Sequence, residues 1–186
     1  HRHSYSVNNE ILDSWRNSGE IFPHTAEARF AAEKGYQQAM TRAIKGLLAK
    51  AALEPARISR LVLATPGLKE APQLARRLGF SPNQLQDPLM ARVGYCATVQ
   101  PLLLLAAALE QAEPGDLILL AAYGTGADAF LFEATGQVPR LRAEAPVAQA
   151  LRRGRELQSY SRYLSFRGVL PPLPGAPFRT FPSTAA

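Results

Sequence analysis

The chain has 186 residues, the length of one domain with a sizeable core, and a single cysteine, Cys96, which excludes an internal disulfide and a cysteine-rich zinc site. Its longest apolar run, residues 101–109, is too short to span a bilayer, and no basic-then-apolar signal segment opens the chain. We therefore expect a cytoplasmic protein without a membrane span and without a bound metal.

The formal net charge of +6 is unevenly distributed. Between residues 140 and 167 only Glu144 and Glu156 oppose seven arginines: Arg140, Arg142, Arg152, Arg153, Arg155, Arg162 and Arg167. Such a cluster is compatible with nucleic acid, with the phosphates of coenzyme A, with an acidic partner, or with a solvated helix face. The absence of zinc-finger spacing, an aromatic RNA-binding signature and a P-loop argues against nucleic acid.

The first predicted element is a long amphipathic helix over residues 25–51. Its apolar side chains recur at three- and four-residue spacing, which places one stripe against a core. Thr25 is the expected N-cap, and Glu54-Pro55 is the expected stop.

A buried strand follows at residues 60–65, because RLVLAT is a short and nearly continuous apolar run closed by Pro66. Residues 71–78 then predict a helix that Pro72 opens and Gly79 ends.

The next predicted helix, residues 98–112, contains LLLLAAAL and is apolar nearly all round, so we expect it to be buried. A Pro-Gly-Asp turn leads to two apolar strands, residues 116–123 and 127–134, which Gly124-Thr125-Gly126 joins into a hairpin. This order of elements predicts an α/β layer with one antiparallel edge.

The pattern divides the chain into four parts. Residues 1–24 are a lead-in or a remnant of cloning, and residues 25–137 are the folded domain. Residues 138–168 form a basic helical extension with a helix expected over residues 147–166. Residues 169–186, rich in proline, are a tail or linker.

Two motifs together indicate a family. GYCATVQP precedes the apolar helix, and YGTGADAF forms the hairpin after it. These resemble the G-N-T-x-x-x-x-P loop and the Y-G-x-G-x-D-A-F hairpin in the C-terminal half of thiolase-superfamily condensing enzymes, nearest to archaeal and bacterial 3-hydroxy-3-methylglutaryl-CoA (HMG-CoA) synthases. The resemblance runs from about Trp15 to about Pro171. It implies the C-terminal half of a thiolase-like α/β fold, a mixed sheet with one buried helix and flanking helices.

The resemblance also shows where catalytic groups are altered. The family's histidine position, at the end of the first predicted strand in LATPGLK, is Ala64, and its asparagine position is Tyr95. The family's nucleophilic cysteine belongs to the other half of the fold. Cys96, just before a helix, is either a nucleophile of lowered thiol pKa or an inert loop thiol. We therefore assign no catalytic residue beyond the two candidates Cys96 and Tyr95.

The same resemblance implies a cleft for coenzyme A thioesters, with no other cofactor. The residues expected to border it are Lys69, Tyr95, Tyr123, Gly124, Thr125, Gly126 and Ala127. For the glycines the alternative is an ordinary hairpin turn, and for Lys69 it is a solvated lysine.

Two functions remain open. In the first, the chain is the C-terminal half of an HMG-CoA-synthase-like acyltransferase that binds or condenses acyl-CoA together with an N-terminal half or within a homo-oligomer. In the second, it is a catalytically degenerate subunit that docks a thiolase or an OB-fold and zinc-ribbon partner. The intact hairpin favours the first function, whereas Ala64 and Tyr95 favour the second.

Overall fold

The computed structural model describes residues 1–65 and 67–170, which form one compact unit over residues 1–151 and a second beginning at Arg152. The strands of the first unit are β1 (His3–Val7), β2 (Ser14–Trp15), β3 (His24–Thr25), β4 (Arg60–Leu63), β5 (Leu117–Gly124) and β6 (Gly126–Glu133). Its longer helices are α2 (Gln38–Ala51), α3 (Glu70–Arg77) and α5 (Gln100–Gln111).

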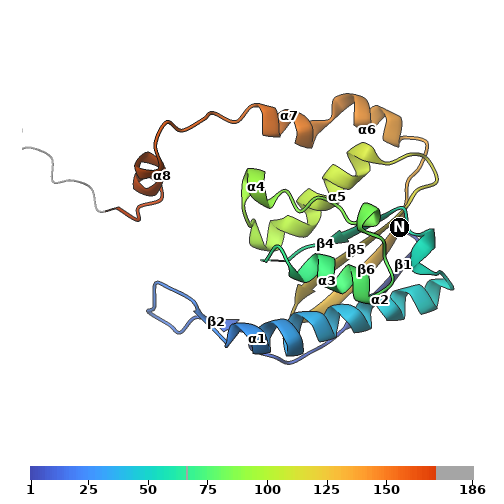
Figure 1. The fold of residues 1–186 in the computed structure, drawn as a ribbon, viewed down its shortest axis with the longest axis horizontal. Coiled ribbons are helices and arrows are strands. Elements are labelled where there is room, and N and C mark those ends of the chain that lie inside the picture. Colours follow the sequence, from blue (N-terminus) through green and yellow to red (C-terminus); the bar gives the residue numbers. More distant parts are fainter. Residues whose placement is uncertain (66, 171–186) are drawn as a thin grey trace, which may run out of the picture. The chain divides into compact units, whose positions relative to one another are not determined.

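A four-stranded sheet in the order β1-β6-β5-β4 forms the centre of the unit, with β4 parallel to β5 and the other pairs antiparallel. Both of its faces are buried. Alternate residues of β5 point to opposite sides, so Leu119 and Ala121 join the core under α2 while Ile118 and Leu120 join the core under α5. The two helices therefore lie on opposite faces of the sheet (Figure 1).

The predicted helix at residues 25–51 is confirmed; it begins at Ala28 and ends, as predicted, at Ala51. It runs from α1 (Ala28–Phe30) through a π-helical segment, η1 (Ala31–Gln37), into α2. Thr25 is not its N-cap, because Thr25 pairs with Ser14 in a short ladder; Glu27 caps instead, and its carboxylate accepts the backbone N–H groups of Arg29 and Phe30. At the far end the left-handed residue Ala52 terminates the helix, rather than Glu54-Pro55, which follows it.

The strand β4, the helix α3 and the β5–β6 hairpin are where the sequence predicts them. The hairpin turns so tightly that Gly124 pairs with Gly126. Gly126 has a φ of +110°, and a Cβ there would lie 1.9 Å from the backbone oxygen of Val7 in β1. Glycine is therefore required at this position for both conformation and packing.

The helix α5 is not buried all round. Leu104, Ala107 and Ala108 pack against the sheet, but the side chain of Leu102 is 65% exposed. The sheet covers one face of the helix and α6 packs on another part of it, but this leaves Leu102 uncovered within the described residues. An apolar helix surface is thus left open.

The strand β1 was not predicted. Residues 3–7, part of the presumed lead-in, pair antiparallel with β6 and complete the edge of the sheet. HSYSV alternates larger side chains with serines, but five residues with only Tyr5 and Val7 apolar are too weak a signal without the partner strand.

The prediction of one continuous helix over residues 147–166 is wrong. Two helices, α6 (Val138–Glu144) and α7 (Pro146–Arg152), follow the hairpin, and a separate helix, α8 (Tyr160–Phe166), begins after Ser159. Ser159 caps α8 by accepting the N–H of Arg162, and Gly154 lies in the intervening segment, so helix-starting and helix-breaking signals interrupt the pattern. All seven arginines of the basic cluster are exposed.

The predicted tail or linker begins with two described residues, Val169 and Leu170; residues 171–186 lie outside the described part of the chain. In the part that is described, no helix combines the length and the apolar character needed to cross a membrane.

A buried glutamine holds together the two loops that precede α5. Gln100 is fully buried; its Oε1 accepts the N–H of Cys96 at 2.9 Å and its Nε2 donates to the carbonyl of Pro88 at 2.8 Å. The amide therefore fixes the position of the loop that carries Tyr95, next to Cys96.

Replacing Gln100 with leucine, which has a similar volume, should lower the free energy of unfolding by about 1–3 kcal/mol for each backbone group left buried and unpaired. Denaturant unfolding measures this. The control Gln73→Leu, at an exposed position of α3, should change stability by no more than about 0.5 kcal/mol. Equal effects of the two substitutions would contradict the role assigned to Gln100.

Candidate functional site

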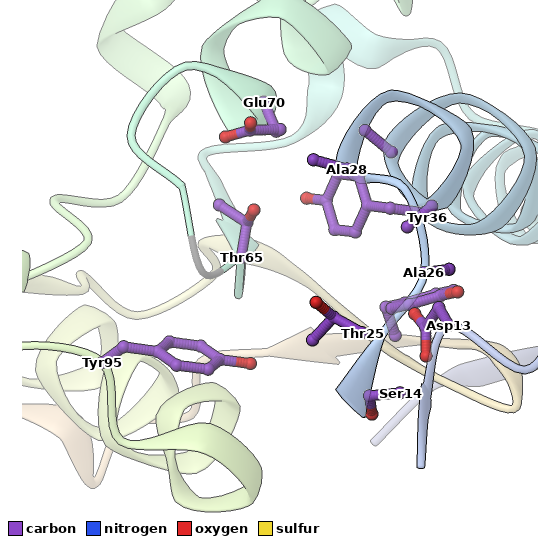
Figure 2. A pocket seen from close by; sticks show the side chains of 12 residues that line it. Asp13, Ser14, Thr25, Ala26, Ala28, Tyr36, Thr65, Glu70 and Tyr95 are labelled. Carbon is purple, nitrogen blue, oxygen red and sulfur yellow. The ribbon is translucent and has the colours of Figure 1, made fainter. Parts of the chain in front are cut away.

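A cavity of about 490 Å³ opens at one end of the sheet (Figure 2). It is lined by Asp13, Ser14, Thr25, Ala26, Ala28, Ala31, Ala32, Tyr36, Thr65, Glu70, Tyr95 and Tyr123. These residues come from five separate segments of the chain, so the fold brings them together.

The parallel pairing of β4 with β5 determines where the cavity lies. Leu63 is level with Ala121, so the residues after β4 and at the end of β5 reach the same edge of the sheet. Thr65 and Tyr123 therefore line one cavity although they are far apart in sequence. Crevices outside the carboxyl ends of parallel strands are the usual place for ligands in α/β folds.

Tyr36 lies at the back of the cavity. The π-helical segment η1 supplies it, only 5% of the residue is exposed, and its ring packs edge-on against Tyr123 with centroids 5.7 Å apart. Its hydroxyl lies near Thr65 but makes no hydrogen bond of good geometry to any described residue. Burial raises the pKa of the Tyr36 phenol, Thr65 lowers it in part, and the Glu70 carboxylate adds to the rise, so the phenol stays neutral at physiological pH.

Glu70 is the first residue of α3 and faces the same space as Tyr36 and Thr65 (Figure 2). Its Oε2 atom is buried, and no partner for it exists within residues 1–65 and 67–170. The carboxylate folds over Gly67, where a Cβ would come within 2.0 Å of Oε2. A glycine at position 67 is thus what allows the carboxylate to lie here.

The cavity lining also includes two more phenols and a second carboxylate. Burial raises the pKa of Tyr95 and of Tyr123, and the nearby Asp13 carboxylate raises both further. Tyr95 extends from its loop across the cavity toward Thr25 and Asp13 (Figure 2). Both phenols therefore remain neutral hydrogen-bonding groups at physiological pH.

The residues expected to border the cleft are only partly gathered here. Tyr95 and Tyr123 line the cavity; Ala64 is buried at the end of β4, one residue before Thr65. Lys69 is exposed at the start of α3 and is not among the lining residues. The hairpin residues Gly124, Thr125, Gly126 and Ala127 do not line it either, and Ala127 belongs to the core beneath α2.

Cys96 is half-buried beside the cavity but does not line it. Its Sγ lies 3.9 Å from the carbonyl oxygen of Val93. No histidine lines the cavity: His24 hydrogen-bonds to Glu20 at 2.9 Å and stacks on Trp15 in the β2–β3 ladder, not at a helix start. The described chain also brings no three potential metal ligands of the His, Cys, Asp or Glu type together.

Of the twelve lining residues only Tyr95 and Tyr123 were predicted from the sequence; Asp13, Tyr36 and Glu70 are the ionisable residues among the other ten. Tyr36 matches the apolar stripe of its helix and therefore looks like a core residue. Glu70 looks like an ordinary first-turn acid, and Asp13 precedes the first predicted element. A signal that could have singled out Glu70 is its place four residues after the Pro66 that closes the strand.

Chemically, the cavity combines donors and acceptors but holds no pair of thiolate and base. Three phenols and three aliphatic hydroxyls line it, together with the carboxylates of Asp13 and Glu70. This arrangement suits binding of a polar group within a largely apolar surround.

Comparison with known proteins agrees with this architecture. Residues 48–131 match the family described as 3-oxoacyl-[acyl-carrier-protein (ACP)] synthase III C terminal. A hydroxymethylglutaryl-CoA synthase of Methanopyrus kandleri is 34% identical over 170 residues, which cover 90% of this chain and 48% of that protein. The chain thus spans about half the length of the curated relatives it matches.

Two solved structures share the fold. MvaS in complex with 3-hydroxy-3-methylglutaryl coenzyme A superposes with a TM-score of 0.70 at 18% identity, covering 94% of this chain and 52% of that one. HMG-CoA synthase complexed with CoA gives a TM-score of 0.68 at 18% identity, covering 88% and 46%. The chain therefore has a thiolase-like fold that corresponds to the C-terminal half of these enzymes, and it resembles the HMG-CoA synthases.

Proposed function

We propose that the chain binds acyl-CoA thioesters in the cavity between η1, α3 and the Tyr95 loop, as one half of a thiolase-like site. The observation that carries this proposal is the Tyr36 hydroxyl, which is buried, faces the cavity and has no partner among the described residues. A buried polar group left unpaired costs about 1–3 kcal/mol, so native proteins rarely keep one without a use.

The relatives support the identity of the ligand. One solved structure of the same fold is a complex with HMG-CoA and another is a complex with CoA. A cavity of about 490 Å³ is large enough to hold an acyl group. Coenzyme A itself is far larger and would lie mostly outside the cavity.

The residues present favour binding over condensation by this chain alone. Condensing chemistry needs a thiolate with a base beside it, and the family's histidine position is Ala64. Cys96 lies outside the cavity lining, and none of the three histidines lines it. We infer that catalysis, where it occurs, depends on groups from a second thiolase-like half.

We expect the 186-residue chain to catalyse no condensation of acetyl-CoA with acetoacetyl-CoA, because no base faces a thiol in the cavity. Release of free CoA, followed with a thiol reagent, measures this. Turnover that disappears on Cys96→Ser would contradict the prediction and would make Cys96 the nucleophile.

Replacing Tyr36 with phenylalanine should weaken acyl-CoA binding by roughly 2- to 10-fold, because one hydrogen bond to the ligand is lost. The free energy of unfolding should stay the same or rise by as much as about 1–3 kcal/mol, because an unpaired buried hydroxyl is removed. Calorimetric titration and denaturant unfolding give the two values. A loss of stability with unchanged binding would make Tyr36 a structural residue.

The pH dependence of stability provides a separate check on Tyr36. Its pKa is higher in the folded chain than in the unfolded one, so the stabilisation is fully present below the unfolded value near 10 and is lost as pH rises beyond it. From about pH 9 upward, the free energy of unfolding should therefore fall less steeply with pH in Tyr36→Phe than in the wild type. Parallel declines would show that the phenol is not the group responsible.

A second candidate function is docking, and the open face of α5 favours it. Leu102 of α5 is 65% exposed, and Val99, directly before the helix, is 62% exposed. Large apolar patches on a folded surface mark interaction sites. In this function the chain pairs with a second thiolase-like half or with another copy of itself, whether or not a ligand is bound.

We expect the isolated chain to self-associate at high concentration and to bind a hydrophobic dye, and Leu102→Asp to reduce both effects. Light scattering and dye fluorescence are the measurements. Leu68→Asp is the matched control, since Leu68 is 64% exposed but lies between β4 and α3. A wild-type chain that stays monomeric without binding dye, or equal effects of the two substitutions, would count against docking through α5.

A further inference from the structure

The charge of the cavity wall narrows the class of ligand. Two of the twelve lining residues, Asp13 and Glu70, are acidic, and the lining contains no lysine, arginine or histidine. A ligand group of negative charge would be repelled by this wall, whereas a positive group would be attracted.

The unpaired atoms indicate the same preference. The Oε2 of Glu70 is a buried acceptor with no donor among the described residues, and the Tyr36 oxygen beside it is also unpaired. An ammonium group has three N–H donors and no acceptor, so it can donate to Glu70, to the lone pairs of Tyr36 and to the Oγ1 of Thr65. These three side chains face the same part of the cavity (Figure 2).

The aromatic residues complete the argument. Tyr36, Tyr95 and Tyr123 come from three different segments and line one cavity. Phenol rings attract cations through their faces, and cages of aromatic residues with nearby carboxylates are a recurring way to bind ammonium groups. A neutral alkyl end would leave both the Glu70 oxygen and the Tyr36 hydroxyl unsatisfied.

We propose that this cavity recognises a ligand end that carries a protonated amine, so that the preferred thioester is an aminoacyl-CoA rather than a neutral or carboxylate-ended one. That the amine is attached to coenzyme A rests on the acyl-CoA binding proposed above. Glu70 is the principal charge partner, held in place over Gly67, and Tyr36 orients the amine.

The test is calorimetric titration of the 186-residue chain at neutral pH with four thioesters of equal chain length. These are 4-aminobutyryl-CoA, 4-hydroxybutyryl-CoA, butyryl-CoA and succinyl-CoA. 4-Aminobutyryl-CoA should bind at least roughly tenfold more tightly than butyryl-CoA, because a hydrogen bond to a charged group raises affinity about ten- to a hundredfold. Succinyl-CoA should bind most weakly.

Two substitutions test the role of Glu70. Glu70→Gln removes the charge and keeps the shape, and Gly67→Ala displaces the carboxylate without changing it. Each should remove most of the preference for the amine. Glu54→Gln, the same change of charge at an exposed position outside the cavity, should leave it intact.

A CoA-free probe separates this inference from the proposed function. Butylammonium and butanol are titrated while the tyrosine resonances are followed by NMR. Glu70-dependent binding of butylammonium with no binding of any thioester would refute acyl-CoA binding but support the amine site. The amine site alone would be refuted if the four thioesters bound with equal affinity, or if 4-hydroxybutyryl-CoA bound as tightly as 4-aminobutyryl-CoA. A chain that binds none of these probes would refute both.

Discussion

The parallel pairing of β4 with β5 is the constraint on which the rest of the structure depends. These two strands are buried on both faces, and their shared register brings Thr65 and Tyr123 to one edge of the sheet. Everything else at the cavity is attached to this edge: η1 lies over one side of it, α3 begins beside it, and the Tyr95 loop reaches it from the start of α5. A shift of one residue in this register would turn each side chain of β4 to the opposite face.

The cavity contains buried polar atoms without hydrogen-bond partners, unlike most of the described structure. Gln100, also buried, has both ends of its amide paired, and that amide fixes a loop. The Tyr36 hydroxyl and the Glu70 Oε2 are equally inaccessible, yet within the described chain neither has a partner. The Oε1 of Gln86 is also buried and unpaired among the described residues but lies outside the cavity, so it is their place in the cavity lining that makes the Tyr36 and Glu70 atoms available to a ligand.

Elements with a strong periodic signal could be predicted from the sequence. RLVLAT, the apolar stripe of α2 and the Gly-Thr-Gly hairpin each follow a local rule, and the family resemblance supplied their order in the fold. The edge strand β1 could not be predicted, because five mostly polar residues give too weak a signal and the hydrogen bonds to β6 define the strand. The burial of α5 was overestimated for a related reason: an apolar sequence indicates that its faces are to be covered, but it does not indicate that the same chain covers all of them.

The site was harder to predict than the fold. Tyr95 and Tyr123 were found because the family motifs include their positions, whereas Tyr36 is indistinguishable from a core residue along the helix. Its role depends on the position of its hydroxyl in the cavity. That position is determined by the π-helical segment that carries Tyr36 and by the sheet edge that faces it. Pairings of this kind are long-range, and no local pattern encodes them.

The measurement that tests this account most directly is a crystal structure of the chain with a non-hydrolysable acyl-CoA analogue. The account predicts that the acyl end enters the cavity and comes within hydrogen-bonding distance of the Tyr36 hydroxyl, while the nucleotide stays outside. A ligand bound elsewhere, with the Tyr36 hydroxyl still unpartnered, would contradict it.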